Sequence, residues 1–331
     1  MPLLSSTYTP PRGFSNAHLQ TVWAGRLRRV DGVAYERERI GTPDGDFLDL
    51  DWVRGGHGRC AVVTHGLEGS AARPYVRGMA RALSRRGWDV CAWNLRGCSG
   101  EPNRHLPMYH SGATYDLDTV VQHALGRYDR LALVGFSLGG NLTLKFLGER
   151  AVDPRVERAV ALSVPVDLAA SSGALARWTN GVYMLYFLRS LRRKVQQKAA
   201  RFPDEVETDG LWRIRSFRQF DDRYTAPMHG FDDAADYWAR SSSRPFLSEV
   251  RTPTLLINAA DDPFLAPTCY PEPEARASAA FHLEQPAHGG HVGFVTFGGS
   301  GDYWSERRAA AFLAGQAEGL LEADAPAAEA A

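Results

Sequence analysis

Residues 135–139 read GFSLG, the Gly-x-Ser-x-Gly pattern of a nucleophile elbow, which presents a serine hydroxyl on a tight turn. An apolar run at 131–134 precedes the pattern and a helical pattern follows it, so the turn joins a strand to a helix. The serine of such a turn has strained dihedral angles, and glycines two positions before and after it prevent a clash. This context predicts that Ser137 is a nucleophile, and the alternative is an ordinary glycine-rich turn.

A serine hydroxyl needs a base that takes its proton, and the base needs an acid that orients it. Residues 258–263 read NAADDP and follow an apolar run, where the acid is expected if the chain order is serine, acid, histidine. Asp262 lies three residues after Ala259 and directly before a proline, which favours it as the acid. Asp261 remains the rival, with capping of the turn as its alternative role.

Residues 288–294 read HGGHVGF, a glycine-rich loop late in the chain that could bring a histidine over the sheet to the serine. We favour His291 as the base because it follows two glycines and lies two residues before Gly293, which permits close approach. His288 is the competing histidine, and we interpret it as a supporting residue of the loop. A metal site at these two histidines is disfavoured because no further ligands stand near them, so we expect neither a metal nor a cofactor.

The carbonyl oxygen that the serine attacks would need two backbone N–H donors, an oxyanion hole. Leu138 directly follows the serine at the start of a predicted helix, so its N–H is one expected donor. The other is expected in the loop after an early strand, which reads HGLEG at 65–69 and indicates the N–H of Leu67. Each donor of this kind lowers the barrier by about 3–4 kcal/mol.

A further polar segment, NLRGCSGEPN at 94–103, follows the next predicted strand. We expect Arg96 to join neighbouring loops by hydrogen bonds. Cys98 is disfavoured as a second nucleophile because no base is evident beside it. The four cysteines of the chain show no CxxC or paired spacing, which favours free thiols in a reducing compartment.

These residues need a scaffold that brings distant loops to one place, and the order of the elements predicts one. Short apolar runs alternate with helical patterns, which is typical of a parallel sheet covered by helices. Strands are predicted at 60–64, 88–95, 131–136, 160–166, 254–258 and 281–283, and helices at 75–86, 113–125, 138–148 and 303–321. Residues 35–53 instead predict an antiparallel hairpin at a sheet edge, and the first 35 residues look mostly loop-like.

The alternation stops after Asp167 and resumes at residue 254. We therefore interpret residues 1–331 as one domain with a helical lid inserted at 168–248. The apolar side chains of the lid would suit an acyl pocket, and simple packing of the lid onto the core is an equal alternative. These side chains are Trp178, Tyr183, Tyr186, Phe187 and Leu188.

The charge is balanced, with 38 Lys and Arg against 38 Asp and Glu, so no long-range field attracts nucleic acid. A local basic run on the lid is interpreted as a solvated helix end, with transient contact to an anionic membrane surface as the alternative. This run comprises Arg189, Arg192, Arg193 and Lys194. No signal peptide or run of 18 apolar residues is evident, so we expect a cytoplasmic protein, with residues 322–331 disordered.

Taken in series, the motifs resemble those of the YheT-like branch of the α/β-hydrolases. They are FSNAHLQT at 14–21, HGLEGS at 65–70, NLRGCSGEPN at 94–103, YHSG at 109–112, GFSLGGN at 135–141, FDDRYTAP at 220–227, NAADDPF at 258–264 and HGGHVGF at 288–294. The resemblance spans about residues 10–300 and implies the α/β-hydrolase fold, with a mostly parallel central sheet flanked by helices.

The resemblance also implies hydrolysis of carboxylic esters by an acyl-enzyme on a catalytic triad of Ser137, Asp262 and His291. Small-molecule acyl or lipid esters are the implied substrates. Some relatives form esters by acyl transfer, so an acyltransferase is the first alternative function. A peptidase or other hydrolase of this fold and a non-catalytic binding protein are the others, and the sequence does not indicate an oligomeric state.

Overall fold

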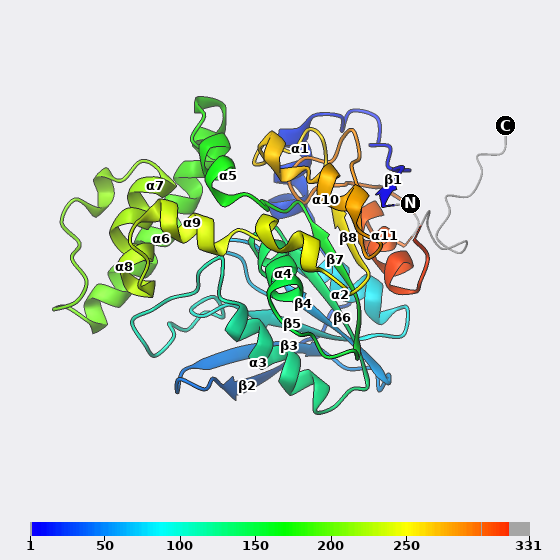
Figure 1. Ribbon diagram of the computed structural model, residues 1–331, viewed down its shortest axis with the longest axis horizontal. Coiled ribbons are helices and arrows are strands. Elements are labelled where there is room, and N and C mark those ends of the chain that lie inside the picture. Colours follow the sequence, from blue (N-terminus) through cyan, green and yellow to red (C-terminus); the bar gives the residue numbers. More distant parts are fainter. Residues whose placement is uncertain (1, 299, 318–331) are drawn as a thin grey trace.

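The computed structural model describes residues 2–298 and 300–317. Within them, nine strands form one sheet in the order β1-β9-β8-β7-β6-β4-β5-β3-β2, with helices on both of its faces (Figure 1). The strands are β1 (Leu3–Leu4), β2 (Glu36–Gly41), β3 (Phe47–Val53), β4 (Arg59–Thr64), β5 (Asp89–Asn94), β6 (Arg130–Phe136), β7 (Val156–Leu162), β8 (Thr254–Ile257) and β9 (Phe281–Glu284). Only the pairs β2–β3 and β3–β5 are antiparallel, so the predicted mostly parallel sheet is confirmed.

The helical elements fall into those that cover the sheet and those inserted between β7 and β8. The first group comprises α1 (Ala17–Val22), η1 (Trp23–Leu27), α2 (Pro74–Ser84), α3 (Thr114–Leu125), α4 (Leu138–Glu149), η6 (Pro267–Cys269), α10 (Glu272–Ala277) and α11 (Trp304–Leu313). The second comprises α5 (Leu168–Leu175), η2 (Trp178–Asn180), α6 (Gly181–Arg201), η3 (Leu211–Arg213), α7 (Phe217–Phe220), η4 (Asp221–Thr225), α8 (Ala226–His229), α9 (Ala234–Ser241) and η5 (Arg244–Glu249).

The central strands are apolar throughout because helices cover both faces of the sheet. In β4, successive side chains alternate between the two faces. Ala61 and Val63 pack in the core on the side of α2 and α11, whereas Cys60 and Val62 pack on the side of α3 and α4. The continuous run CAVVT therefore supplies both layers, which explains why it showed no alternation of apolar and polar residues.

The hairpin predicted at the sheet edge is formed by β2 and β3, and the two acidic positions of β3 are buried. Asp49 lies opposite Arg39 and Asp51 opposite Arg37 in the antiparallel register. The guanidinium groups donate to these carboxylates at 2.7 Å and 2.8 Å respectively. The alternation of Asp with Leu and Trp thus reflects two packed faces, one apolar and one made of ion pairs.

The prediction that the first 35 residues are mostly loop is wrong for α1 and η1. The helix α1 is short, and it begins where the Asn16 side chain accepts the N–H of Leu19 at 3.0 Å. It packs against the loop of residues 288–294, since a Cβ at Gly290 would lie 2.3 Å from the carbonyl oxygen of Ala17. Tertiary packing therefore stabilises a helix that is too short for a periodic apolar pattern.

Two predicted boundaries also differ from the structure. The strand predicted at 160–166 is β7, which spans Val156–Leu162 and ends before Ser163, a residue with a φ of 54°. The closing helix predicted at 303–321 is α11, which ends at Leu313 because Gly315 adopts a φ of 97° and its N–H bonds back to the helix. The tail predicted to be disordered, 322–331, lies outside the described residues.

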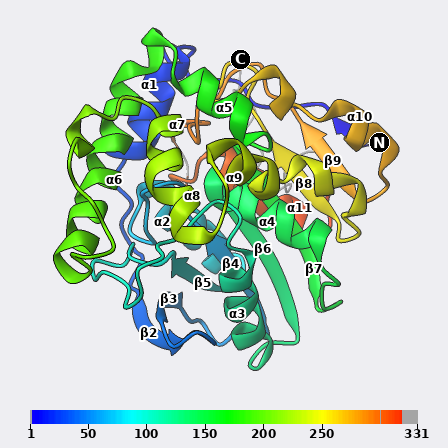
Figure 2. The same ribbon diagram turned by 60° about the vertical axis from the view of Figure 1, so that its left-hand side comes forward.

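Residues 168–249 form the second group of helices and contain no strand, and most of them gather on one side of the sheet (Figures 1 and 2). We call this segment the helical insertion. Its longest helix, α6, has 21 residues. Across residues 2–298 and 300–317, no helix is both long enough and apolar enough to span a bilayer.

Candidate active site

Ser137 lies in the turn between β6 and α4 with a φ of 53° and a ψ of −120°, a conformation that non-glycine residues rarely adopt. A Cβ at Gly135 would lie 2.5 Å from the carbonyl oxygen of Gly139. A Cβ at Gly139 would lie 2.5 Å from the carbonyl oxygens of Thr64 and His65. Both positions therefore require glycine, which explains the motif and lets the chain close tightly around the serine.

Three predicted site residues meet at one point. His291 Nε2 lies 2.9 Å from Ser137 Oγ, and His291 Nδ1 lies 2.9 Å and 3.2 Å from the two carboxylate oxygens of Asp262. The carboxylate favours the tautomer with the proton on Nδ1, so Nε2 is the acceptor that faces the serine hydroxyl. Asp262 and His291 are buried while Ser137 is half-buried, so the hydroxyl remains the accessible end of this chain of contacts.

The rival residues Asp261 and His288 form a second pair on the same two loops. His288 Nδ1 lies 3.2 Å from Asp261 Oδ2, and their side chains are 44% and 23% exposed, against 8% and 0% for His291 and Asp262. Asp261 Oδ1 also accepts the N–H of Gly290 at 2.8 Å. Asp261 thus ties the acid loop to the histidine loop, while Asp262 faces the imidazole that approaches the serine.

The two histidines are not arranged as a metal site, because each contacts a different aspartate. Within the described parts of the chain, no three or more side chains of His, Cys, Asp or Glu cluster in a way that could hold a metal ion.

Three further residues position the histidine loop and were missed by sequence analysis. Thr21 Oγ1 accepts the backbone N–H of His291 at 2.9 Å, and the ring of Phe264 stacks on the imidazole with 4.1 Å between centroids. Ser163 Oγ accepts the N–H of Val292 at 2.9 Å. Thr21 and Phe264 lie inside motifs that carried the family resemblance, so the signal was present, but their contacts depend on packing between distant segments.

The expected oxyanion donors are available. Leu138 is the first residue of α4, so the helix supplies no acceptor for its N–H. The N–H of Leu67 has no acceptor among the residues that the structure describes. Its neighbours Gly66 and Glu68 donate their N–H groups to tyrosine hydroxyls at 3.1 Å and 2.9 Å. The loop is therefore fixed on both sides of one free donor.

Glu68 holds this loop with a buried carboxylate and has a positive φ of 53°. The carboxylate accepts from the hydroxyls of Tyr109 at 2.6 Å and Ser190 at 2.5 Å, and Lys194 Nζ lies 2.9 Å away. Burial acts to raise the pKa of Glu68, but the ammonium of Lys194 and the hydroxyl donors outweigh it and lower the pKa. Since Ser190 and Lys194 belong to α6, the helical insertion directly contacts the loop that carries Leu67.

Two other groups near the serine are held neutral. Burial lowers the pKa of His65 to about 4, and its Nε2 accepts the N–H of Leu95 at 3.1 Å, so this histidine joins two loops. Lys194 Nζ lies 2.9 Å from Cys98 Sγ, a neighbour that the sequence did not indicate. Burial nevertheless raises the pKa of Cys98 to about 11, against the opposing effect of Lys194. A thiol with such a pKa is a poor nucleophile, in agreement with the prediction.

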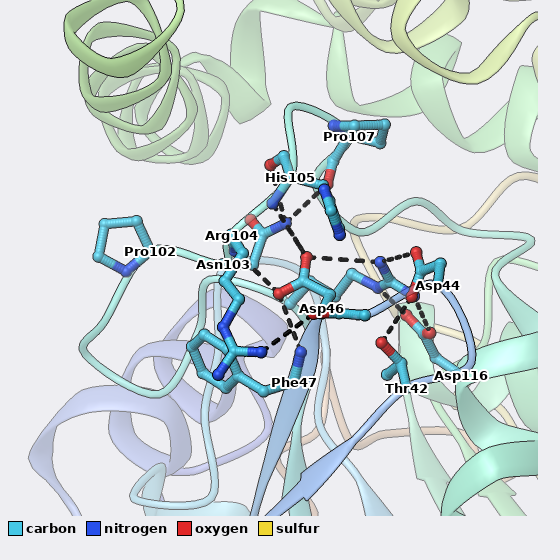
Figure 3. Close-up of polar contacts among 12 residues, drawn as sticks. Thr42, Asp44, Asp46, Phe47, Pro102, Asn103, Arg104, His105, Pro107 and Asp116 are labelled. Carbon is cyan, nitrogen blue, oxygen red and sulfur yellow. Dashed lines mark hydrogen bonds and ion pairs between the residues drawn. The ribbon is translucent and has the colours of Figure 1, made fainter.

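Arg96 joins neighbouring loops, as predicted. Its guanidinium donates to Asp116 of α3 at 2.7 Å and 2.8 Å and to Asp44 in the hairpin turn at 2.6 Å. Asp46 Oδ2 lies 3.5 Å from Arg96 Nη1 and accepts from the Asn103 side chain at 2.7 Å, a contact that Figure 3 shows. Arg96 thereby fixes the 94–103 segment at its place beside the site.

The basic run on α6 does not form one exposed patch. Arg192 is buried and donates to the carbonyl oxygen of Ile214, and Lys194 contacts the buried carboxylate of the 65–69 loop. Only Arg189 and Arg193 are exposed. The interpretation as a helix end is wrong, because the run lies in the middle of α6; half of it is solvated, and the other half anchors α6 to the fold.

Two cavities meet at Ser137 and His291. The first lies beneath the helical insertion, and its wall is mainly apolar: Leu168, Leu175, Phe187, Leu191, Phe217 and Phe220. The second lies between the N-terminal helices and the start of α6: Thr21, Val22, Arg26, Arg73, Val182 and Tyr186. A molecule bound at Ser137 can therefore extend in two directions.

The five apolar residues predicted to line a pocket or to pack the insertion divide between these roles, and one has neither. Phe187 lines both cavities, and Tyr183 and Tyr186 line the second. Leu188 is buried in the core of the insertion. Trp178 does neither, since 90% of its surface is exposed.

One acidic residue, Asp221, lines the apolar cavity. Its carboxylate accepts from Thr225 Oγ1 at 2.6 Å and from Trp238 Nε1 at 2.9 Å. Burial of the carboxyl group raises its pKa to about 7. This residue begins η4 within the 220–227 motif, for which sequence analysis proposed no function.

The chain is similar to known hydrolases along most of its length. A family model described as the alpha/beta hydrolase fold matches residues 62–297. The chain is 38% identical over 299 residues to YheT of Escherichia coli (strain K12), a protein named as a candidate esterase, with 88% of each chain covered. It is 28% identical over 306 residues to the human phospholipase ABHD3, covering 89% of this chain and 75% of that one. The solved esterase Pf2001 of Pyrococcus furiosus superposes with a TM-score of 0.52 at 17% identity, covering 80% and 90%.

Proposed function

Because the chain belongs to the α/β-hydrolase fold family and is an enzyme of the esterase and lipase type, we propose that it cleaves acyl or lipid esters through an acyl-enzyme on Ser137. The observation that carries this proposal is the unbroken line of contacts from Ser137 Oγ through the imidazole of His291 to Asp262, each of 2.9 Å. A hydroxyl, a base and an orienting carboxylate in this order are the parts that acyl transfer to serine requires.

In the proposed reaction, His291 Nε2 takes the proton of Ser137 as the oxygen attacks the ester carbonyl. The N–H groups of Leu67 and Leu138 stabilise the oxyanion, which they can do without reorganisation because no acceptor among the described residues competes for them. The tetrahedral intermediate then expels the alcohol, which receives the proton from His291. Water, deprotonated by the same nitrogen, attacks the acyl-enzyme and releases the acid. Asp262 holds the imidazole in its tautomer and stabilises its cation.

The two cavities suggest where the halves of the ester bind. We assign the acyl chain to the apolar cavity beneath the helical insertion and the alcohol to the cavity that Arg26 and Arg73 line. On this assignment the insertion is the lid of the site, since Phe187 of α6 lines both cavities where they meet. The relatives named as a candidate esterase and a phospholipase support esters with acyl chains as the substrate class.

A series of p-nitrophenyl esters graded in acyl length, assayed with the parent chain and with Ser137→Ala, tests the proposal. We expect turnover by the parent and a loss of about 10⁶-fold in kcat for the variant, with an unchanged unfolding temperature. The parent should also be labelled at Ser137 by a fluorophosphonate. Equal turnover by the two proteins, or no labelling of the parent, would contradict the proposal and favour a non-catalytic role.

Product analysis in excess alcohol separates hydrolysis from its first alternative. Hydrolysis yields the free acid as the main product, whereas an acyltransferase would yield a new ester from the same acyl-enzyme. An amide and peptide series run in parallel tests for a peptidase.

A further inference from the structure

Large hydrophobic side chains are exposed in a cluster beside the second cavity. Among the described residues nine such side chains are exposed, and six of them belong to the short segments 19–27 and 178–185. We call these six the apolar face: Leu19, Val22, Leu27, Trp178, Val182 and Leu185. Trp178 is 90% and Val182 80% exposed, although a folded chain normally exposes such residues only singly.

The two segments that carry the apolar face lie side by side. The ring of His18 in α1 stacks on Tyr183 in α6 with 5.7 Å between centroids. Further along both segments, the guanidinium of Arg26 in η1 lies 4.3 Å from the ring centroid of Tyr186 in α6. The exposed residues therefore belong to one continuous surface formed by the N-terminal helices and the start of α6.

This surface has no negative charge in its own segments. Residues 1–30 and 168–203 contain no Asp or Glu, although the chain has 38 acidic and 38 basic residues. Arg26, Arg177 and Arg189 are exposed, and none has a carboxylate within 4.0 Å in the part of the chain that the structure describes. Arg177 precedes Trp178, and Arg189 follows Leu185 by one turn on the same side of α6. The apolar face is thus flanked by unpaired positive charge.

We propose that the apolar face docks on the surface of a bilayer of anionic phospholipids. A helix whose exposed side is apolar and then basic lies in the interface of such a membrane, with its apolar residues among the acyl chains and its arginines at the phosphates. Tryptophan is enriched at that depth, because its ring is apolar and its N–H is polar. The positive charge complements anionic headgroups. If the face stayed in water, the exposed apolar surface of Trp178 and Val182 would be unfavourably hydrated with no compensating interaction.

The apolar face borders the second cavity, so docking would bring the entrance of the site to the membrane. Val22 and Val182 belong to the face and also line the cavity that leads to Ser137. A docked molecule would therefore hold the mouth of this cavity against lipid, and an ester could enter without crossing water. This surface goes beyond the proposed function, on which it depends only for the identity of Ser137 as the reacting residue.

Vesicle sedimentation with the full-length Ser137→Ala protein tests docking without any turnover. We expect binding to vesicles of phosphatidylcholine and phosphatidylglycerol, and at least tenfold weaker binding to phosphatidylcholine alone. Trp178→Ser with Leu185→Ser should weaken binding to the mixed vesicles at least tenfold, since neither residue lines a cavity. Trp212→Ser is the matched control, a half-exposed tryptophan outside the face that should leave binding unchanged.

A charge pair of variants tests the electrostatic part. Arg177→Gln with Arg189→Gln should weaken binding to the mixed vesicles several-fold and reduce its dependence on salt. Arg251→Gln with Arg276→Gln removes two exposed charges elsewhere on the surface and should have no effect. No binding by the Ser137→Ala protein, or equal binding to both vesicle types, would overturn the proposal.

The competing occupant of the apolar face is a second copy of the chain. Sedimentation velocity of the parent and of the Trp178→Ser, Leu185→Ser double variant should show the same mass. A dimer that this double variant dissociates would overturn docking on lipid. Because vesicle binding is measured on a protein without the serine, and hydrolysis of a soluble acetyl ester is measured on the parent, either proposal can fail while the other stands.

Discussion

The two halves of the site are held by different kinds of interaction. Ser137, Asp262 and His291 lie on loops that follow β6, β8 and β9, and the strands from β6 to β9 are consecutive neighbours in the sheet. Backbone register therefore sets the distances among the three loops. The helical insertion instead reaches the loop of residues 65–69, the proposed oxyanion loop, through side chains, chiefly the contact of Lys194 with Glu68.

This difference determines which half of the site should tolerate substitutions. A loop positioned by strand register keeps its place when one side chain is altered, so variants there test chemistry rather than folding. A buried ion pair depends on both partners, because removing one leaves an uncompensated charge. Variants in the insertion should therefore alter the positions of the 65–69 loop and of the insertion, and lower the stability of the protein, at the same time.

The largest expected effect within the sheet half separates the two aspartates. Asp262→Asn should lower kcat on an ester about 10³- to 10⁴-fold, because the amide no longer favours the required tautomer of His291. Asp261→Asn should lower kcat less than about tenfold, since the residue supports the loop through His288 and Gly290 and does not contact His291. Steady-state kinetics on one p-nitrophenyl ester compares them, with unfolding temperatures as the check on folding. A larger loss for Asp261→Asn would reverse the assignment of the acid.

The next effect lies where the halves meet. Lys194→Met leaves the carboxylate of Glu68 buried without its cation, so we expect a loss of about 3–5 kcal/mol in stability and about a tenfold fall in kcat. Lys194→Arg should restore most of both, since it returns the charge. Cys98→Ala is the matched control, because it removes another contact of Lys194 and should change neither quantity by much. A fall in stability without any fall in kcat would show that α6 does not position the oxyanion loop.

The contribution of Glu68 to stability should depend on pH in opposite ways in the parent and in Lys194→Met. In the parent, the pKa of Glu68 is lowered, so the carboxylate stabilises the fold above its ordinary pKa of 4.5 and loses that contribution as the pH falls. In Lys194→Met, burial is no longer outweighed and the pKa should be raised. Stability should then fall as the pH rises above about 4.5. Between pH 4 and 8, this carboxylate should therefore raise the unfolding temperature of Cys98→Ala as the pH rises. In Lys194→Met it should lower the unfolding temperature over the same range.

The sheet half could be predicted from sequence because its signals are local. The GFSLG turn requires glycines at positions 135 and 139 for steric reasons, and short apolar runs mark the buried strands. The choice between Asp262 and Asp261 stayed open, since adjacent residues on one turn differ only in direction. The geometry resolves which one faces His291.

The contacts that hold the insertion and the N-terminal helix α1 against the site could not be predicted, because they join distant segments. The contact between Lys194 and Glu68 spans 126 positions along the chain, and the bond from His291 to Thr21 spans 270. Neither contact can be recognised from the spacing of apolar residues within one segment. Lys194 was interpreted as part of a solvated basic run, and the segment around Thr21 as loop, because burial against another element cannot be read from a single segment.

The smallest expected effect concerns substrate preference in the insertion half. Asp221 lines the apolar cavity and burial raises its pKa to about 7, so its ionisation places a charge beside the proposed acyl chain near neutral pH. In the parent, the KM for a medium-chain ester should rise several-fold from pH 6 to pH 8, while that for an acetyl ester stays level. Asp221→Asn should abolish this rise, because the amide keeps polar contacts with Thr225 and Trp238 but does not ionise in this range.

The same substitution has a stability consequence of known sign. The unfolded chain ionises Asp221 near its ordinary pKa of 3.8, while the folded chain does so near 7, so this residue makes the parent less stable as the pH rises between these values. Asp221→Asn should remove that decline, whereas Asp222→Asn, at the adjacent exposed position, should not. If the KM of the medium-chain ester rises equally in all three proteins, the acyl chain does not lie beside Asp221, and the assignment of the apolar cavity to the acyl half is wrong.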